Sequence, residues 1–159
     1  MSKGRNTLSI KVDTSGLNEY LRRLGDAAEE AVMPAAKAMA EVYVEAIHAT
    51  PLPVSLRPHW FHGTEFKKTG IKYGPFSPGT LKRSIYWSYS PERSGKGFAT
   101  YAVGYHYKKA PYAHMVEFGT EHSKGVGFMS RTAASDAVER DAYEAGEKVL
   151  LDALAKVGE

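Results

Sequence analysis

The first half of the chain carries helical patterns of hydrophobic residues after a short alternating segment. Residues 7–13 alternate apolar and polar side chains, which predicts a half-buried strand. Residues 17–24 repeat apolar side chains at helical spacing, and Gly25 predicts the end of this helix. A longer stripe of mostly small residues over 28–47 predicts a second helix that another helix can approach closely. Pro34 falls inside the stripe, so we expect its regular part to begin near that position.

The second half changes from a long irregular segment to a strand pattern. Residues 52–80 are rich in proline and glycine without a steady period, which predicts a long loop with room for a short hairpin. Alternating, aromatic-rich segments at 84–89, 98–107 and 112–118 predict an antiparallel meander. Ser130 or Thr132 then begins a final helix.

These elements predict one α+β domain over residues 1–159. We expect the N-terminal strand and helices to pack on the antiparallel β-meander, with the C-terminal helix closing the fold. The length and the 43% hydrophobic content are typical of a soluble globular domain with its own core. The chain has no apolar run near the ~20 residues that a membrane span requires. We therefore expect no membrane partner.

Charge divides the chain unevenly. Residues 67–109 hold nine basic side chains and one acidic one, a net of +8, so the remainder carries 12 basic and 17 acidic residues, a net of −5. The basic segment suits contact with the acidic face of a neighbouring subunit, or contact with nucleic acid. A solvated basic surface is the simpler interpretation and stays open.

The search for catalytic chemistry yields little. The chain has no cysteine, no phosphate-binding glycine pattern and no nucleophile elbow. His59 and His62 follow Pro58 without an evident third ligand, which disfavours a metal site. His106 and His114 lack a fixed third group, and Glu117 and Glu121 lack any sign of a pocket. We expect no enzyme activity, no metal and no cofactor.

The basic segment also interleaves its charges with aromatic residues. A sheet surface of this kind is typical of proteins that bind single-stranded nucleic acid by stacking and phosphate contact. One face of any sheet buries its aromatics, however, and no recognised DNA- or RNA-binding motif is present. A basic-sheet nucleic-acid-binding module is therefore the alternative hypothesis.

Five short segments occur in a recognisable order. They are Gly16 to Leu21, Ala46 to Pro51, Pro78 to Ile85, Tyr112-Ala-His-Met-Val-Glu-Phe-Gly-Thr120, and Gly127-Phe-Met-Ser-Arg-Thr-Ala133. In this order the chain resembles the tail-completion proteins (neck, or head–tail connector proteins) of long-tailed bacteriophages over nearly its whole length. Two departures stand out: residues 52–80 fill what is a short connection in the family, and Gly127 stands where the family has proline.

The resemblance implies a structural virion protein of the phage neck, without catalysis. It implies a homo-oligomeric ring, a hexamer or similar, at the head–tail junction, where it enables head–tail joining or tail completion. The partners would be the phage connector and tail proteins, with viral DNA passing nearby without specific contacts. The protein would occupy the host cytoplasm during assembly and the virion neck afterwards.

Candidate contact residues come from the resemblance segments. On a strand, Val116 and Phe118 would face the core and Glu117 would point outward, either toward the basic segment of a neighbour or simply into solvent. Gly119 permits a backbone angle that other residues resist, and Thr120 suits a bond to the turn backbone. We expect subunit or partner contacts at Glu117, Phe118, Gly119 and Thr120, and at Lys82 and Arg83.

Overall fold

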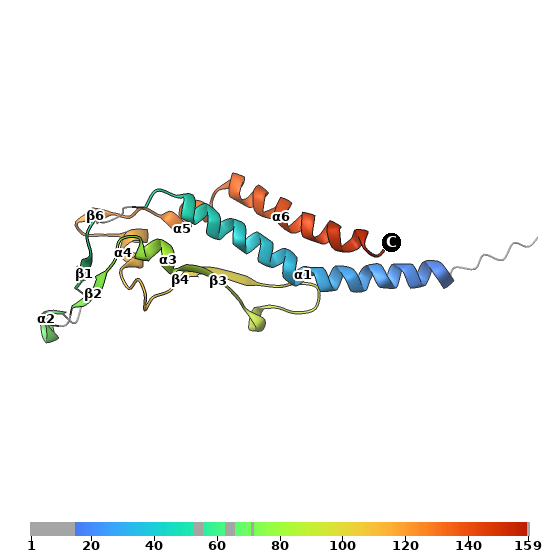
Figure 1. Cartoon of the computed structure of the whole chain (residues 1–159), viewed down its shortest axis with the longest axis horizontal. Coiled ribbons are helices and arrows are strands. Elements are labelled where there is room, and N and C mark those ends of the chain that lie inside the picture. Colours follow the sequence, from blue (N-terminus) through green and yellow to red (C-terminus); the bar gives the residue numbers. More distant parts are fainter. Residues whose placement is uncertain (1–14, 53–55, 63–65, 71, 159) are drawn as a thin grey trace, which may run out of the picture.

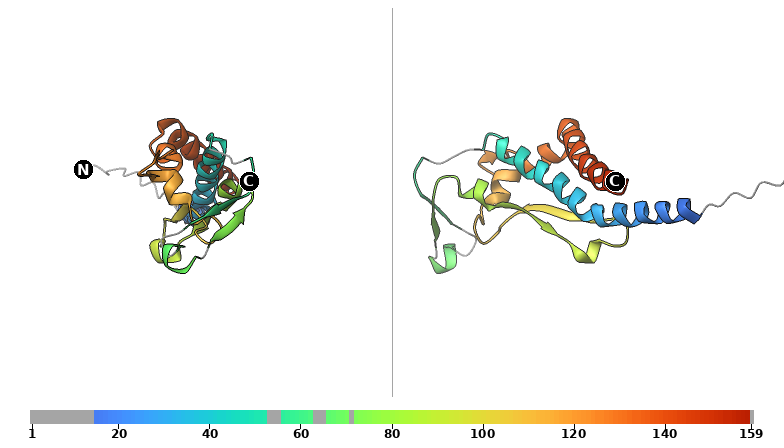
Figure 2. Two further views of the ribbon diagram at one scale, coloured as in Figure 1. Left: turned by 90° about the vertical axis from the view of Figure 1, so that its left-hand side faces the viewer. Right: turned by 45° about the vertical axis from the view of Figure 1, so that its right-hand side comes forward.

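The molecule is elongated, with one long helix running along most of its length. The computed structural model describes residues 15–52, 56–62, 66–70 and 72–158. Helix α1 (Ser15–Ala49) has helix α6 (Asp136–Ala155) on one side and the strands β3 (Ile85–Tyr89) and β4 (Tyr101–Tyr105) on the other (Figure 1). A small β-hairpin extends from one end, and the first turns of α1 extend from the other (Figure 2). The α+β class predicted from the sequence is confirmed.

Helix α1 is continuous, so the predicted break at Gly25 is wrong. Gly25 does not adopt a positive φ, and a Cβ built on it meets no described atom within 4 Å. Pro34 also lies inside the helix, where its exposed position lets solvent satisfy the backbone acceptor that its missing N–H leaves open. The predicted strand at residues 7–13 lies outside the described residues.

The predicted small-residue stripe of α1 is the surface against which α6 packs. A Cβ added to Gly146 of α6 would lie 2.9 Å from Met39 Cγ and 3.5 Å from the Ala35 carbonyl oxygen. Ala31, one turn before Ala35 on α1, and Ala142, one turn before Gly146 on α6, are buried too. Small side chains here let the two backbones approach closely, and this α1–α6 seam is the main contact between N- and C-terminal parts of the chain.

Two of the three predicted meander strands form. Strands β3 and β4 pair antiparallel, with Ile85 opposite Tyr105 and Tyr89 opposite Tyr101. A 3-10 turn at Pro91–Arg93 lies in their connection, and the short helix α3 (Thr80–Ser84) leads into β3. The sheet is therefore a two-stranded ribbon rather than a three-stranded meander.

The predicted third strand is instead the helix α4 (Ala113–Phe118). The predicted final helix is also divided, into α5 (Phe128–Ala133) and α6, because Ala134 and Ser135 leave the helical path between them. Between α4 and α5, the two-residue strands β5 (Gly119–Thr120) and β6 (Ser123–Lys124) form a tight hairpin.

The segment 52–80 contains the small hairpin that its sequence allowed. Strands β1 (His59–Phe61) and β2 (Tyr73–Phe76) pair antiparallel with an irregular register, and the short helix α2 (Phe66–Thr69) lies between them in the chain. The hairpin extends away from α1 and α6 (Figure 1).

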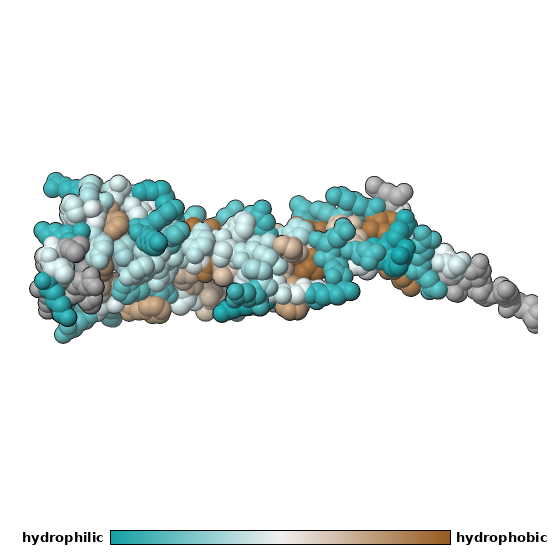
Figure 3. Space-filling view, turned by 90° about the horizontal axis from the view of Figure 1, so that it is seen from below, coloured by the Kyte–Doolittle hydropathy of each residue, from teal (hydrophilic) through white to brown (hydrophobic). Residues whose placement is uncertain are grey.

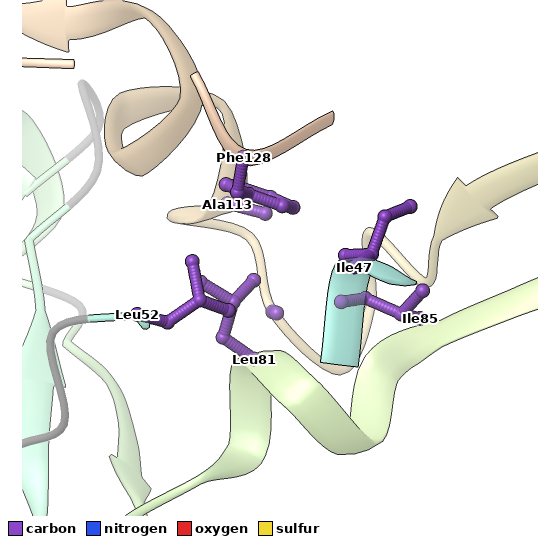
Figure 4. Close-up of a cluster of buried hydrophobic side chains, with 7 residues drawn as sticks. Ile47, Leu52, Leu81, Ile85, Ala113 and Phe128 are labelled. Atoms are coloured by element: carbon purple, nitrogen blue, oxygen red, sulfur yellow. The ribbon is translucent and has the colours of Figure 1, made fainter. Parts of the chain in front are cut away.

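A compact apolar cluster joins segments that are far apart in the sequence (Figure 4). Ile47 lies in the last turn of α1 and Leu52 in the segment that follows it, whereas Leu81 and Ile85 come from α3 and β3, and Phe128 from α5. Phe128 is fully buried, as are Ala110 and Ala113 beside it. Burial of each leucine, isoleucine or phenylalanine side chain in the cluster contributes about 1.5–3 kcal/mol to stability. This core lies at the hairpin end of α1, so the opposite end of that helix carries little packing.

The continuity of α1 has a direct test in Gly25→Ala. Alanine is favoured over glycine by about 1 kcal/mol inside a helix, so we expect higher thermal stability or helicity by circular dichroism. A comparable loss would mean that residue 25 has the left-handed backbone of a helix end. Gly79→Ala is the matched control, because Gly79 has a φ of 76° and alanine there should destabilise the fold.

Candidate functional site

The segment Tyr112 to Thr120 consists mostly of helix α4, whose glutamate holds the next helix, α5, in place. Glu117 Oε2 accepts a hydrogen bond from the Met129 backbone N–H at 2.9 Å, and Oε1 accepts one from the Ser130 N–H at 2.9 Å. Both donors belong to the first turn of α5, where backbone N–H groups have no helical partner. Glu117 is buried, so its predicted surface position is wrong, while its predicted subunit contact stays a prediction. Its role is to cap α5.

The environment of Glu117 favours the charged carboxylate. Burial by itself raises the pKa of Glu117, but hydrogen bonds from the Met129 and Ser130 backbone and the Ser130 side chain act in the opposite direction. The result is a pKa below the usual 4.5. A buried carboxylate held this way supports the fold rather than catalysis, because its oxygens are occupied by α5.

Phe118 is the residue of the segment that lies on the surface. Its side chain is 79% exposed, so the prediction that it faces the core is wrong. On a strand, Val116 and Phe118 would share a face, whereas on a helix residues two apart point in different directions. Val116 does pack against the apolar cluster. Phe118 stays a candidate contact residue because a large exposed aromatic side chain favours a partner.

Gly119 and Thr120 perform the local roles that the sequence predicts. Gly119 has a φ of 87°, and the Thr120 Oγ1 accepts a hydrogen bond from the His122 backbone N–H at 3.3 Å. A Cβ on Gly119 would lie 2.6 Å from the Ser123 carbonyl oxygen, so a larger residue would separate β5 from β6. The Gly127 N–H also donates to the Glu117 carbonyl oxygen at 2.9 Å, which returns the chain to α4.

Tyr112 begins the same segment and holds the β1–β2 hairpin. Its ring packs edge-on against His59, with centroids 4.9 Å apart, and against Phe76, with centroids 5.2 Å apart. The centroid of the Phe61 ring lies 6.5 Å from that of the Tyr112 ring. Burial raises the pKa of Tyr112 above its usual 10.0, against opposing effects of Arg83 and of a hydrogen bond with the Leu81 backbone. One residue therefore joins the hairpin to α3 and the core.

Lys82 and Arg83 make hydrogen bonds within the chain. The Lys82 Nζ donates to the His48 carbonyl oxygen at 2.8 Å, and the His48 Nε2 donates to the Lys82 carbonyl oxygen at 2.9 Å. The Arg83 Nη1 donates to the Pro78 carbonyl oxygen at 3.0 Å. Lys82 thus satisfies the C-terminal end of α1, where a cation is favourable. Their predicted role in subunit contact stays a prediction.

The histidines are dispersed. His59 packs in the aromatic group with Tyr112, and His106 lies against Tyr86 with ring centroids 5.4 Å apart. His106 and His114 do not face each other across neighbouring strands, because residue 114 belongs to a helix. Over the part of the chain that the structure describes, no three His, Asp or Glu side chains are placed to hold a metal ion.

The basic–aromatic segment does not form a broad sheet surface. Alternate side chains of β3 and β4, among them Ile85 and Trp87, lie on the side that packs on α1, and the Lys37 Nζ lies 5.2 Å from the centre of the Trp87 ring. Tyr86 and Tyr89 are exposed. The nucleic-acid hypothesis stays untested by this arrangement, although the stacking surface is smaller than a three-stranded meander would offer.

Two apolar surfaces emerge that the sequence did not single out as sites. The first is on the projecting turns of α1, where Leu17 is 56% and Leu21 is 54% exposed. The second is a groove of about 530 Å³ between α1 and α6, flanked by Phe98 and Tyr143. Figure 3 shows hydrophobic surface both near the projecting end and toward the middle of the molecule. The helical stripe of leucines was visible in the sequence, but its lack of cover was not.

Comparison with known proteins adds no relative. No family model, curated protein or solved structure matches the chain. Among the described residues, no helix is long and apolar enough to cross a membrane.

Glu117→Gln tests the cap on α5. We expect the free energy of unfolding to fall by about 1–3 kcal/mol, because a neutral amide replaces charge-assisted bonds to two backbone N–H groups at the start of α5. Since folding lowers the pKa of Glu117, its contribution is present above pH 4.5 and is lost as the pH falls through the folded-state pKa. The difference between wild type and variant, measured by urea denaturation, should shrink in that direction.

The control for this measurement is Glu144→Gln. Glu144 is exposed and pairs with Arg140 at 3.9 Å, so its loss should change stability by about 0.5 kcal/mol or less. Equal effects of the two variants, or a Glu117 effect that does not decline in acid, would contradict the cap.

Tyr112→Ala tests the attachment of the hairpin. Loss of three aromatic contacts of about 0.5 kcal/mol each predicts roughly tenfold faster amide hydrogen exchange over residues 59–61 and 73–76. Tyr112→Phe keeps the ring, so exchange there should stay close to wild type. Tyr86→Ala removes an aromatic ring from β3 and serves as the control. Unchanged hairpin exchange in Tyr112→Ala would show that other contacts hold it.

Proposed function

We propose that this chain is a structural subunit of the neck of a long-tailed bacteriophage, where it forms a ring at the head–tail junction. Its role would be head–tail joining or tail completion, which needs neither a catalytic residue nor a cofactor. The observation that carries the proposal is the connection between two of the segments that resemble the family. Glu117 of the first binds the backbone of Met129 and Ser130 of the second.

The other resemblance segments converge on the same place. Leu81 and Ile85 lie in the apolar cluster with Ala113 and Phe128, and Ile47 comes from the end of α1. Segments that recur together in a family are expected to share a core. Four of the five segments therefore meet in one packing unit, which supports treating their order as a family pattern rather than as coincidence.

The shape of the molecule also suits a subunit that contacts neighbours. The β1–β2 hairpin extends from one end, and it exposes Trp60 and Tyr73. The start of α1 extends from the other end and exposes leucines. Projecting elements with exposed apolar side chains are typical of assembly proteins. A hexamer or similar ring would use them between copies or toward the connector and tail proteins, with DNA passing through without specific contacts.

The test is deletion of the gene from the phage or prophage that encodes it, followed by negative-stain imaging of the lysate. We expect DNA-filled heads and separate tails, with infectivity restored when the wild-type protein is supplied from a plasmid. The portal, connector and major tail genes should flank the coding sequence.

Normal infectious particles from the deletion strain would overturn the proposal. Heads without packaged DNA would place the defect before head–tail joining and would also contradict the proposal. Strong, salt-sensitive binding of random DNA by the isolated protein would favour the nucleic-acid alternative instead.

A further inference from the structure

The projecting start of α1 carries an apolar stripe of four side chains. Leu17, Tyr20, Leu21 and Leu24 follow one another at helical spacing, so they share one face. Leu17, Tyr20 and Leu21 are exposed. The helix extends past the end of α6 at this point (Figure 1). Residues 15–26 span about 18 Å of helix, and their apolar face is here named the leucine stripe.

A mostly apolar groove, which could receive such a stripe, lies between α1 and α6 of the same molecule. Val32, Ala36 and Met39 of α1 form one wall, and Tyr143 and Leu150 of α6 form the other. The groove holds about 530 Å³. Its small residues admit a helix or large side chains, and an amphipathic helix commonly docks on such a surface through residues one turn apart.

The leucine stripe cannot enter the groove of its own molecule. Residues 17–24 and residues 32–39 belong to the same continuous helix, so the stripe extends away from the groove along one axis. Contact between the two surfaces therefore requires two copies of the chain.

The placement of one opposite-charge pair, Arg23 at the stripe border and Glu147 in the groove, favours a second copy as the occupant. Helix α6 carries six acidic and two basic residues, a net of −4, and Glu147 lines the groove. The stripe segment 15–26 carries Arg22 and Arg23 against Glu19 and Asp26, a net of zero, so the segment as a whole is neutral. Arg23 lies one turn after Tyr20 at the border of the stripe, where it can approach a carboxylate at the groove edge.

We propose that the leucine stripe of one subunit docks in the α1–α6 groove of the next. Such a contact joins two different surfaces, so each subunit offers one free stripe and one free groove. Repetition of the contact closes a ring when the rotation between subunits permits, and otherwise extends a filament. The inference rests on the proposed function in that it identifies the partner in the neck ring as another copy of this chain.

The test measures the association of the full chain by sedimentation velocity over a range of concentrations. Wild type should form assemblies larger than a dimer. Leu21→Glu, on the stripe, and Tyr143→Glu, at the groove, should each weaken association by about tenfold or more, because each would place a carboxylate in an apolar contact. Both side chains are more than half exposed, so the folded subunit should tolerate either change.

Leu151→Glu is the matched control. Leu151 is 55% exposed on α6 and does not line the groove, so this variant should associate like wild type. Circular dichroism of all three variants verifies that each is folded.

Mixing the two defective variants separates this contact from a symmetric one. A Leu21→Glu subunit retains its groove and a Tyr143→Glu subunit retains its stripe, so an equal mixture should form one-to-one dimers and nothing larger. Failure to form mixed dimers, a monomeric wild type, or equal loss in Leu151→Glu would overturn the inference. The proposed function is judged separately by the deletion phage, whose heads and tails report on joining whichever surface the subunits use.

Discussion

The buried carboxylate of Glu117 is the contact on which the arrangement of the second half of the chain depends. Its two oxygens accept the Met129 and Ser130 N–H groups and so begin α5 directly against the end of α4. That position directs Phe128 into the apolar cluster. Helix α5 then leads through a two-residue break to α6, whose packing along α1 completes the body. A charge is costly to bury, but one that satisfies unpaired donors at a helix start offsets that cost.

The backbone between the two helices is shaped to make this contact possible. The β5–β6 hairpin turns the chain within a few residues, and Gly119 and Gly125 pass so closely that neither has room for a side chain. Gly127 then takes a φ of 62° just before α5. Proline is held near −65°, so proline at this position would require a different entry to the helix. The turn leads directly to Phe128, whose side chain enters the apolar cluster.

The difference between prediction and structure at α4 shows what an isolated sequence pattern leaves open. The strands at 85–89 and 101–105 were predictable because their alternating aromatic and β-branched residues match a half-buried ribbon. In α4 the inward residues are Ala113, Val116 and Glu117, at helical spacing. One of these is charged, so the hydrophobic pattern alone suggested a strand with the glutamate outside. The cap became recognisable only once its N–H partners, 12 and 13 residues later, were placed beside it. The break at Gly25 failed for a related reason, because the sequence does not reveal the backbone angle of a glycine.

The distribution of packing along α1 connects the fold to assembly. The apolar cluster gathers around Ile47 at one end, and α6 covers the middle through Ala35, Met39 and Gly146. The first turns have neither kind of support, yet they carry leucines at the spacing of a buried face. A helix in a protein is stabilised mainly by the packing of its apolar face rather than by intrinsic propensity. The first turns of α1 would therefore be stabilised when a neighbouring subunit covers their leucine face. The same helix forms one wall of the α1–α6 groove, so a subunit contact through the leucine stripe would relate the orientation of each subunit directly to that of the next.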